Sequence, residues 1–139
     1  MTQFEKPHEG EYAPYAIQYI KLVPDDGELL KHLERNLEEG KKFFRSIPAA
    51  KLTARYAEGK WTVKEILSHI IDTERIYSYR ALRFSRNDAT ELPGFEQDDY
   101  VKFSGANERT IDDLLEEFTA VRLSTITLLQ SLDADALLR

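Results

Sequence analysis

Three long stretches of the chain repeat apolar residues at alternating spacings of three and four, which is the pattern of an amphipathic helix. They span residues 26–47, 62–86 and 110–132. No segment shows the two-residue alternation that is typical of a half-buried strand. The pattern therefore predicts an all-α protein, with residues 1–139 forming a single domain built on three long helices.

The first stretch, residues 26–47, is expected to begin at Asp26 as its N-cap and to end before Pro48. An aspartate accepts hydrogen bonds from the unpaired amides of a first turn, and a proline does not continue a helix. His32 lies in this helix beside leucines, but several charged residues follow it. We interpret His32 as a histidine at the edge of the helix rather than as a metal ligand.

The second stretch, residues 62–86, carries the strongest start signal in the chain. Thr62 and Glu65 are spaced as a capping box, in which each side chain accepts from the backbone amide of the other residue. Trp61 and Ile66 occupy the two hydrophobic positions that flank such a cap. The centre of the apolar face of this helix is predicted to consist of Val63, Ile66, Ile70, Tyr77, Ala81 and Phe84.

Two charged residues fall on apolar helix faces. With a turn of about 100° per residue, Glu74 lies close to Ile70 and Tyr77, and Arg122 lies near the centre of the stripe in 110–132. A buried charge is strongly unfavourable unless it is paired. We therefore expect Glu74 and Arg122 to meet as a buried ion pair that fixes the register of the two helices.

The remaining segments precede or connect the long helices. Residues 1–24 form an N-terminal arm in which Pro14 opens a short helix, and the aromatic side chains of the arm are expected to pack on the bundle. Residues 48–61 are a connection with one helical turn. Residues 87–109 exceed the usual loop length, which predicts either a helical turn near 98–102 or a functional covering segment.

Composition excludes several classes of chemistry. The 139 residues include no Cys, so disulfides, thiol nucleophiles and Cys-ligated metals are ruled out. No nucleophile elbow or Gly-rich phosphate loop is present. A net charge of -6 without a basic cluster argues against nucleic acid. No apolar run approaches the roughly 20 residues of a membrane span, and the N-terminus is polar, so a cytoplasmic protein is expected.

The three histidines of the chain are His8, His32 and His69. No two of them have the spacing of a metal-binding pair on one helix. His69 lies at the edge of the apolar face of the second helix, four residues after Glu65, whereas di-iron bundles use a spacing of three. By its placement alone, His69 is interpreted as a structural histidine on the flank of a helix.

The stretch GKWTVKEILSHIIDTERIYSYRALRFSRND (59–88) resembles the second-helix signature of the DinB-like superfamily. The similarity continues through residues 92–101 and 114–132 and reaches back to residues 11–24. This resemblance implies an up-down-down-up four-helix bundle with a long crossover between helices 2 and 3. It further implies a metal-dependent hydrolase or a thiol-dependent transferase, often a homodimer.

The resemblance also implies a divalent metal held by three histidines. One of them would be His69, and the other two would come from an HxxxH pair on a fourth helix. The metal (Zn, Ni, Fe or Mn) would activate a bound water or thiol. Residues 1–139 contain no such pair, and neither His8 nor His32 matches a family ligand. We therefore expect the fourth helix to be missing and the chain to be inactive by itself. Whether this chain binds a metal of its own is left open by the resemblance.

Three long helices and a short N-terminal helix from a four-helix plan would leave an apolar seam exposed. Such a seam favours self-association, and we expect a homo-oligomer, most simply a dimer. The alternative function is a non-catalytic oligomerisation or binding module that keeps the bundle without the chemistry. The small-molecule substrate of the enzymatic alternative is not identified by the sequence.

Overall fold

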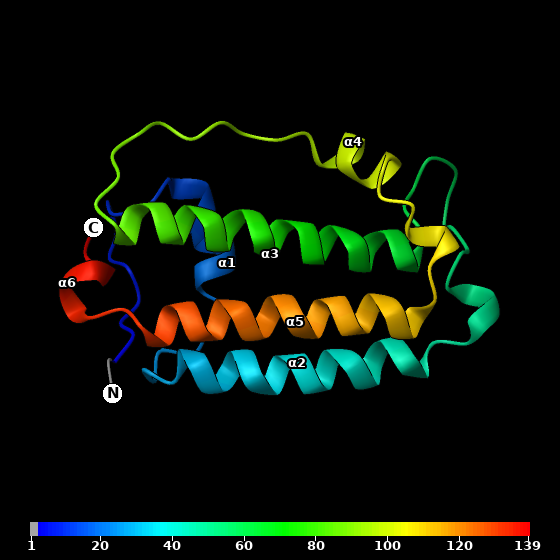
Figure 1. The fold of residues 1–139 in the computed structure, drawn as a ribbon, viewed down its shortest axis with the longest axis horizontal. Helices are drawn as coiled ribbons and strands as arrows, with labels where there is room; N and C mark the ends of the chain where they lie inside the picture. Colours follow the sequence, from blue (N-terminus) through cyan, green and yellow to red (C-terminus); the bar gives the residue numbers. More distant parts are fainter. Residues whose placement is uncertain (1–2) are drawn as a thin grey trace.

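The computed structural model describes residues 3–139 and contains three long helices that lie side by side (Figure 1). The long helices are α2 (Leu29–Ser46), α3 (Val63–Ser85) and α5 (Ile111–Gln130). Helix α5 lies between the other two and packs against both. Residues 3–139 contain no strand, and one isolated antiparallel bridge joins Arg55 and Thr62. The predicted all-helical class is confirmed.

The direction of the long helices follows from the connections between them. Helices α2 and α3 run antiparallel, whereas α3 and α5 run in the same direction (Figure 1). Two parallel helices need a connection as long as the helix, and the crossover 87–109 runs back along α3 to provide it. The three long helices therefore have the up-down-down order.

Shorter helices precede, connect and follow the long ones. They are η1 (Pro14–Ala16), α1 (Ile17–Ile20), η2 (Ala49–Lys51), α4 (Gln97–Lys102), η3 (Ala106–Glu108) and α6 (Ala134–Leu137). The short helix after Pro14, the turn after α2 and the helical turn within the crossover are all present as predicted. Among the described helices, none combines the length and apolar character that a membrane span requires.

Local capping determines where α3 and α5 begin. The hydroxyl of Thr62 accepts from the amide of Glu65 at 3.1 Å, and the carboxylate of Glu65 accepts from the amide of Thr62 at 2.8 Å. This is the predicted capping box. At α5, Thr110 accepts from the amide of Asp113 at 3.1 Å, but the Asp113 carboxylate pairs with Arg109. The cap of α5 is therefore one-sided.

The prediction that Asp26 is the N-cap of α2 is wrong, because the helix begins at Leu29. Gly27 has a φ of 73°, so a left-handed turn separates Asp26 from the first helical turn. The Asp26 carboxylate accepts from the amide of Glu28 at 3.0 Å and lies 2.8 Å from Nε2 of His32. His32 is thus held at the edge of α2 by a carboxylate.

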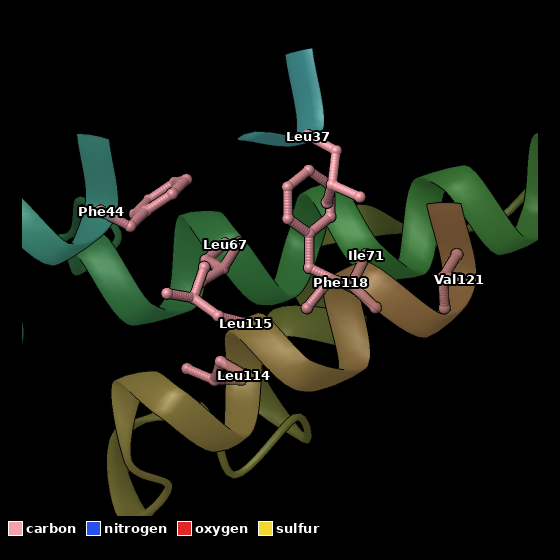
Figure 2. Close-up of a cluster of buried hydrophobic side chains, with 8 residues drawn as sticks. All are labelled: Leu37, Phe44, Leu67, Ile71, Leu114, Leu115, Phe118 and Val121. Carbon is pink, nitrogen blue, oxygen red and sulfur yellow. The ribbon is translucent and has the colours of Figure 1, made fainter. Parts of the chain in front are cut away.

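The core is built from apolar side chains of all three long helices (Figure 2). It consists of Leu37 and Phe44 of α2, Leu67 and Ile71 of α3, and Leu114, Leu115, Phe118 and Val121 of α5. Burying each of these side chains stabilises the fold by about 1.5–3 kcal/mol relative to exposure. At Gly40 a Cβ atom would lie 3.4 Å from the ring of Phe118, so α2 and α5 approach closely there.

The predicted ion pair between Glu74 and Arg122 is present within this core. Arg122 donates from Nε and Nη2 to the two carboxylate oxygens of Glu74 at 2.8 and 3.0 Å. Its Nη1 donates to the carbonyl of Leu33 at 2.9 Å and to Oδ1 of Asn36 at 3.1 Å. The side chains of Arg122 and Glu74 are only 8% and 12% exposed. One guanidinium therefore joins all three long helices.

The predicted apolar face of α3 is wrong by part of a turn. Leu67 and Ile71, which lie outside the predicted set, are 0% and 1% exposed and pack in the core. Ile66, Tyr77 and Phe84, which were predicted at the centre of the face, are 36%, 61% and 47% exposed. Helix α3 is apolar on two adjacent faces, and only one of them packs against α5.

The expected packing of the N-terminal arm is also wrong for two of its four aromatic residues. Tyr15 and Tyr19 are exposed, whereas Tyr12 and Ile20 are half-buried. Helix α1 is a single turn, so it can turn only one side toward the rest of the chain. Residues 1–2 of the arm lie outside the described part of the chain.

Candidate functional site around His69

Helix α3 presents His69 in its second turn, where the imidazole is half-buried. The ring of Trp61 lies against it, with a centroid separation of 4.8 Å and an angle of 47° between the planes. Oγ1 of Thr73, one turn further along α3, lies 3.4 Å from Nδ1 of His69. Within residues 3–139, no group forms a hydrogen bond with Nε2 of this imidazole. The imidazole of His69 is thus contacted on one face by Trp61 and at Nδ1 by Thr73.

A part-buried polar network fixes the start of α3 beside Trp61. The Glu65 carboxylate accepts from Nη1 and Nη2 of Arg55 at 2.7 and 3.1 Å, and from Nδ2 of Asn107 at 2.8 Å. The Thr62 hydroxyl donates to Oδ1 of Asn107 at 2.7 Å. The Arg55 guanidinium is the main cause of the lowered pKa of Glu65, against the opposing effect of burial. The network ties the end of the crossover to the segment that carries Trp61.

An acidic side chain also lies close to His69. Asp72 is half-buried three residues further along α3, and burial raises the pKa of its carboxyl group, with Arg75 opposing the shift. Arg75 also pairs with Glu117 of α5, which pairs in turn with Arg109. Burial acts to raise the pKa of Glu117, but the hydrogen bonds from these two arginines outweigh it and lower the pKa. The flank of α3 near His69 is therefore strongly charged.

The three histidines are not brought together. Because α2 and α3 run antiparallel, His32 in the first turn of α2 and His69 in the second turn of α3 lie near opposite ends of the bundle (Figure 1). His8 is exposed in the N-terminal arm. In the part of the chain that the structure describes, no group of three His, Asp or Glu side chains could hold a metal ion. His69 can supply one imidazole, which does not complete a three-histidine site.

Two surface grooves border α3. The larger, of about 860 Å³, is formed by Tyr77, Arg80, Ala81, Phe84, residues 87–92 and Arg139. The smaller, of about 460 Å³, lies between α3 and α5. The larger groove follows the exposed apolar face of α3, and His69 is not part of its lining.

Sequence reasoning missed the roles of Trp61 and Asn107. The sequence places Trp61 directly before the capping box, but its contact with His69 depends on the path of the chain entering α3. Asn107 lies 45 residues from Thr62, and no local pattern marks it as a partner. The sequence marks Asn107 only as a polar residue within an unusually long crossover.

The fold and the site define a class of helical bundle in which a long crossover follows the helix that carries a single half-buried histidine. A protein-family model described as the DinB superfamily matches residues 32–139. The match covers more than half of the chain, and the chain therefore belongs to the DinB superfamily. No curated protein and no solved structure shows significant similarity to it.

Proposed function

We propose that this chain acts within a metal-dependent hydrolase or thiol-dependent transferase of the DinB superfamily, and that His69 provides one ligand to its divalent metal. The proposal rests on the contacts of the two ring nitrogens of His69. A metal-binding imidazole has one nitrogen for the ion and the other held by a hydrogen-bonding group. In His69 these two roles fall to Nε2, which has no partner among residues 3–139, and to Nδ1, which faces Thr73.

The described residues supply one of the expected ligands and not the other two. No catalytic step follows from this chain's residues alone, and the single imidazole supports weak metal binding rather than a tightly held ion. Zn, Ni, Fe and Mn all accept imidazole nitrogen, so the choice of ion stays open.

The fluorescence of Trp61 offers a direct test, because the chain has one Trp and its ring lies against His69. A paramagnetic ion such as Co²⁺ should quench this fluorescence when it binds at His69. We expect the quenching to be lost in His69→Gln and kept in His32→Gln, which removes a histidine at the far end of the bundle. Equal quenching in the two variants and the unaltered chain would refute the proposal.

A second candidate function is a non-catalytic module that binds another helix or a second copy of itself. The observation that favours it is the exposed apolar face of α3, which includes Ile66, Tyr77 and Phe84. Apolar patches of this kind mark interaction surfaces. Under this proposal the chain forms a dimer through α3.

The oligomeric state tests the second candidate. We expect sedimentation to show a dimer that Tyr77→Ser converts to a monomer. Tyr56→Ser is the matched control, because Tyr56 is also exposed but precedes α3. A monomeric unaltered chain, or equal dissociation by both substitutions, would contradict self-association through α3.

A further inference from the structure

The larger groove beside α3 has one wall from the helix and one from the crossover. The helix wall carries two exposed aromatic side chains, Tyr77 and Phe84, which are 61% and 47% exposed. Residues 87–92 form the other wall, because the crossover runs back along α3 (Figure 1). The volume of about 860 Å³ lies within the range of about 300–1,000 Å³ that is typical of small-molecule sites.

A motif that ends α3 holds the crossover wall in place. Asn87 has a left-handed φ of 58°, and its amide donates to the carbonyl of Phe84 at 2.8 Å. The amide of Asp88 donates to the carbonyl of Arg83 at 3.0 Å. These two bonds form the Schellman arrangement, which reverses the chain at the end of a helix. The carboxylate of Asp88 pairs with Arg83 and accepts from the amide of Thr90 at 3.0 Å. The groove is therefore built by the folded chain itself.

Arg80 supplies a positive charge between the two walls. Its guanidinium carbon lies 5.5 Å from the centre of the Tyr77 ring, and its Nη2 donates to the carbonyl of Pro93 at 3.4 Å. Within residues 3–139, no carboxylate forms an ion pair with this guanidinium. A guanidinium that lies over an aromatic ring keeps the N–H donors of its edge for a planar anion. Arg80 can therefore bind a carboxylate from outside the chain.

The charges that line the groove favour an anion. Nη1 of Arg139 donates to the carbonyl of Ser85 at 2.8 Å, so a cation caps a carbonyl at the end of α3. The described residues pair no carboxylate with Arg139. Of the two acidic residues in the lining, Asp88 is paired with Arg83, and Glu91 is exposed. Two guanidiniums thus stand against one unpaired carboxylate, in a chain whose net charge is -6.

We propose that this groove binds a small organic anion in which one carboxylate is attached to a flat aromatic body. The carboxylate pairs with Arg80, and the body lies along Phe84 and the half-buried Leu92. Apolar contact provides affinity, and the ion pair fixes the orientation. Tyr77 follows His69 by about 12 Å along the helix, and His69 does not line the groove. The inference therefore does not rest on the proposed function.

Two probes of the same shape test this inference, namely naphthoate and the uncharged naphthamide. Each is titrated into the ¹⁵N-labelled 139-residue chain, and the backbone amide signals are followed by NMR. We expect naphthoate to shift the amides of residues 87–92 saturably, and naphthamide to bind about fivefold more weakly. The indole signal of Trp61, whose ring lies against His69, should not move.

Three variants separate an ion pair from general apolar binding. Arg80→Gln should weaken naphthoate binding about fivefold, to the level of naphthamide. Glu91→Gln removes the opposing carboxylate and should strengthen it. Arg35→Gln is the matched control, because Arg35 is exposed on α2 and also has no ion pair among the described residues. It should leave the affinity unchanged. Amide signals outside the groove that match those of the unaltered chain show that each variant is folded.

Several results would overturn the inference. They are equal affinities for naphthoate and naphthamide, equal losses in Arg80→Gln and Arg35→Gln, and shifts that include the Trp61 indole. Shifts of residues 87–92 that appear on raising the protein concentration without a probe would assign the groove to a second copy of the chain, and would also overturn it. Metal binding at His69 is measured separately by quenching, so each proposal can fail without the other.

Discussion

Arg122 is the side chain that connects the three long helices. Besides the Glu74 carboxylate, its guanidinium reaches the carbonyl of Leu33, and it lies 5.2 Å above the centre of the Phe118 ring. All three guanidinium nitrogens of Arg122 therefore donate to groups of α2 or α3.

We predict that Glu74→Gln lowers the free energy of unfolding by about 3–5 kcal/mol, because it leaves a buried guanidinium without its counter-charge. Urea unfolding followed by circular dichroism measures the change. Glu116→Gln is the control, since Glu116 is exposed on α5 and should change stability by less than about 0.5 kcal/mol. Equal stabilities of the two variants would show that the pair does not stabilise the fold.

The pair of Glu65 and Arg55 gives a pH-dependent prediction. The folded chain lowers the pKa of Glu65 below its ordinary value of 4.5, so this carboxylate stabilises the fold above that value. The contribution is lost as the pH falls through the lowered pKa. We predict that Glu65→Gln is less stable than the unaltered chain at pH 7, and that the difference shrinks below about pH 4.5. A difference that does not change with pH would contradict this account.

At the scale of elements, α3 is distinguished by its two apolar faces. Leu67 is fully buried against α5, whereas the adjacent Ile66 lies on the exposed face. We predict that Leu67→Ala costs about 2–5 kcal/mol of folding stability and that Ile66→Ala costs less than about 1 kcal/mol. Chemical unfolding of both variants checks the difference. A larger loss for Ile66→Ala would mean that the helix packs through the other face.

The elements that the sequence predicts well are those set by local chemistry. The capping box of Thr62 and Glu65 acts over one helical turn, and the helical turn of the crossover is also local. The pairing of Glu74 with Arg122 follows from helix geometry, because both charges lie on apolar stripes. The choice between the two faces of α3 does not follow from periodicity, because each face satisfies the same spacing rule.

The site required information that periodicity does not contain. Trp61 lies against His69, and the entry into α3 is held by Arg55 and by Asn107, of which Asn107 is distant in sequence. Family resemblance singles out His69, and the structure adds the two neighbours that contact its ring, Trp61 and Thr73. The prediction that a fourth helix is missing stays a prediction.

At the scale of the whole molecule, three helices share one core while one side of α3 remains exposed. If this face joins two copies, association stabilises the folded state, and the stabilisation increases with the logarithm of the protein concentration. We predict that the thermal midpoint rises with concentration in the unaltered chain and is independent of concentration in Tyr77→Ser. Differential scanning fluorimetry over a hundredfold range of concentration, about two decades, measures this dependence. A constant midpoint in both proteins would exclude association through α3.

The central claim is that His69 presents Nε2 as a metal ligand, and a Zn²⁺ titration followed by nitrogen NMR of the histidine rings tests it most directly. We predict that Nε2 of His69 shifts as Zn²⁺ is added, with Nδ1 protonated in the zinc-bound form, and that the rings of His8 and His32 respond less. A His69 signal that does not move, or that moves no more than His32, would contradict the account.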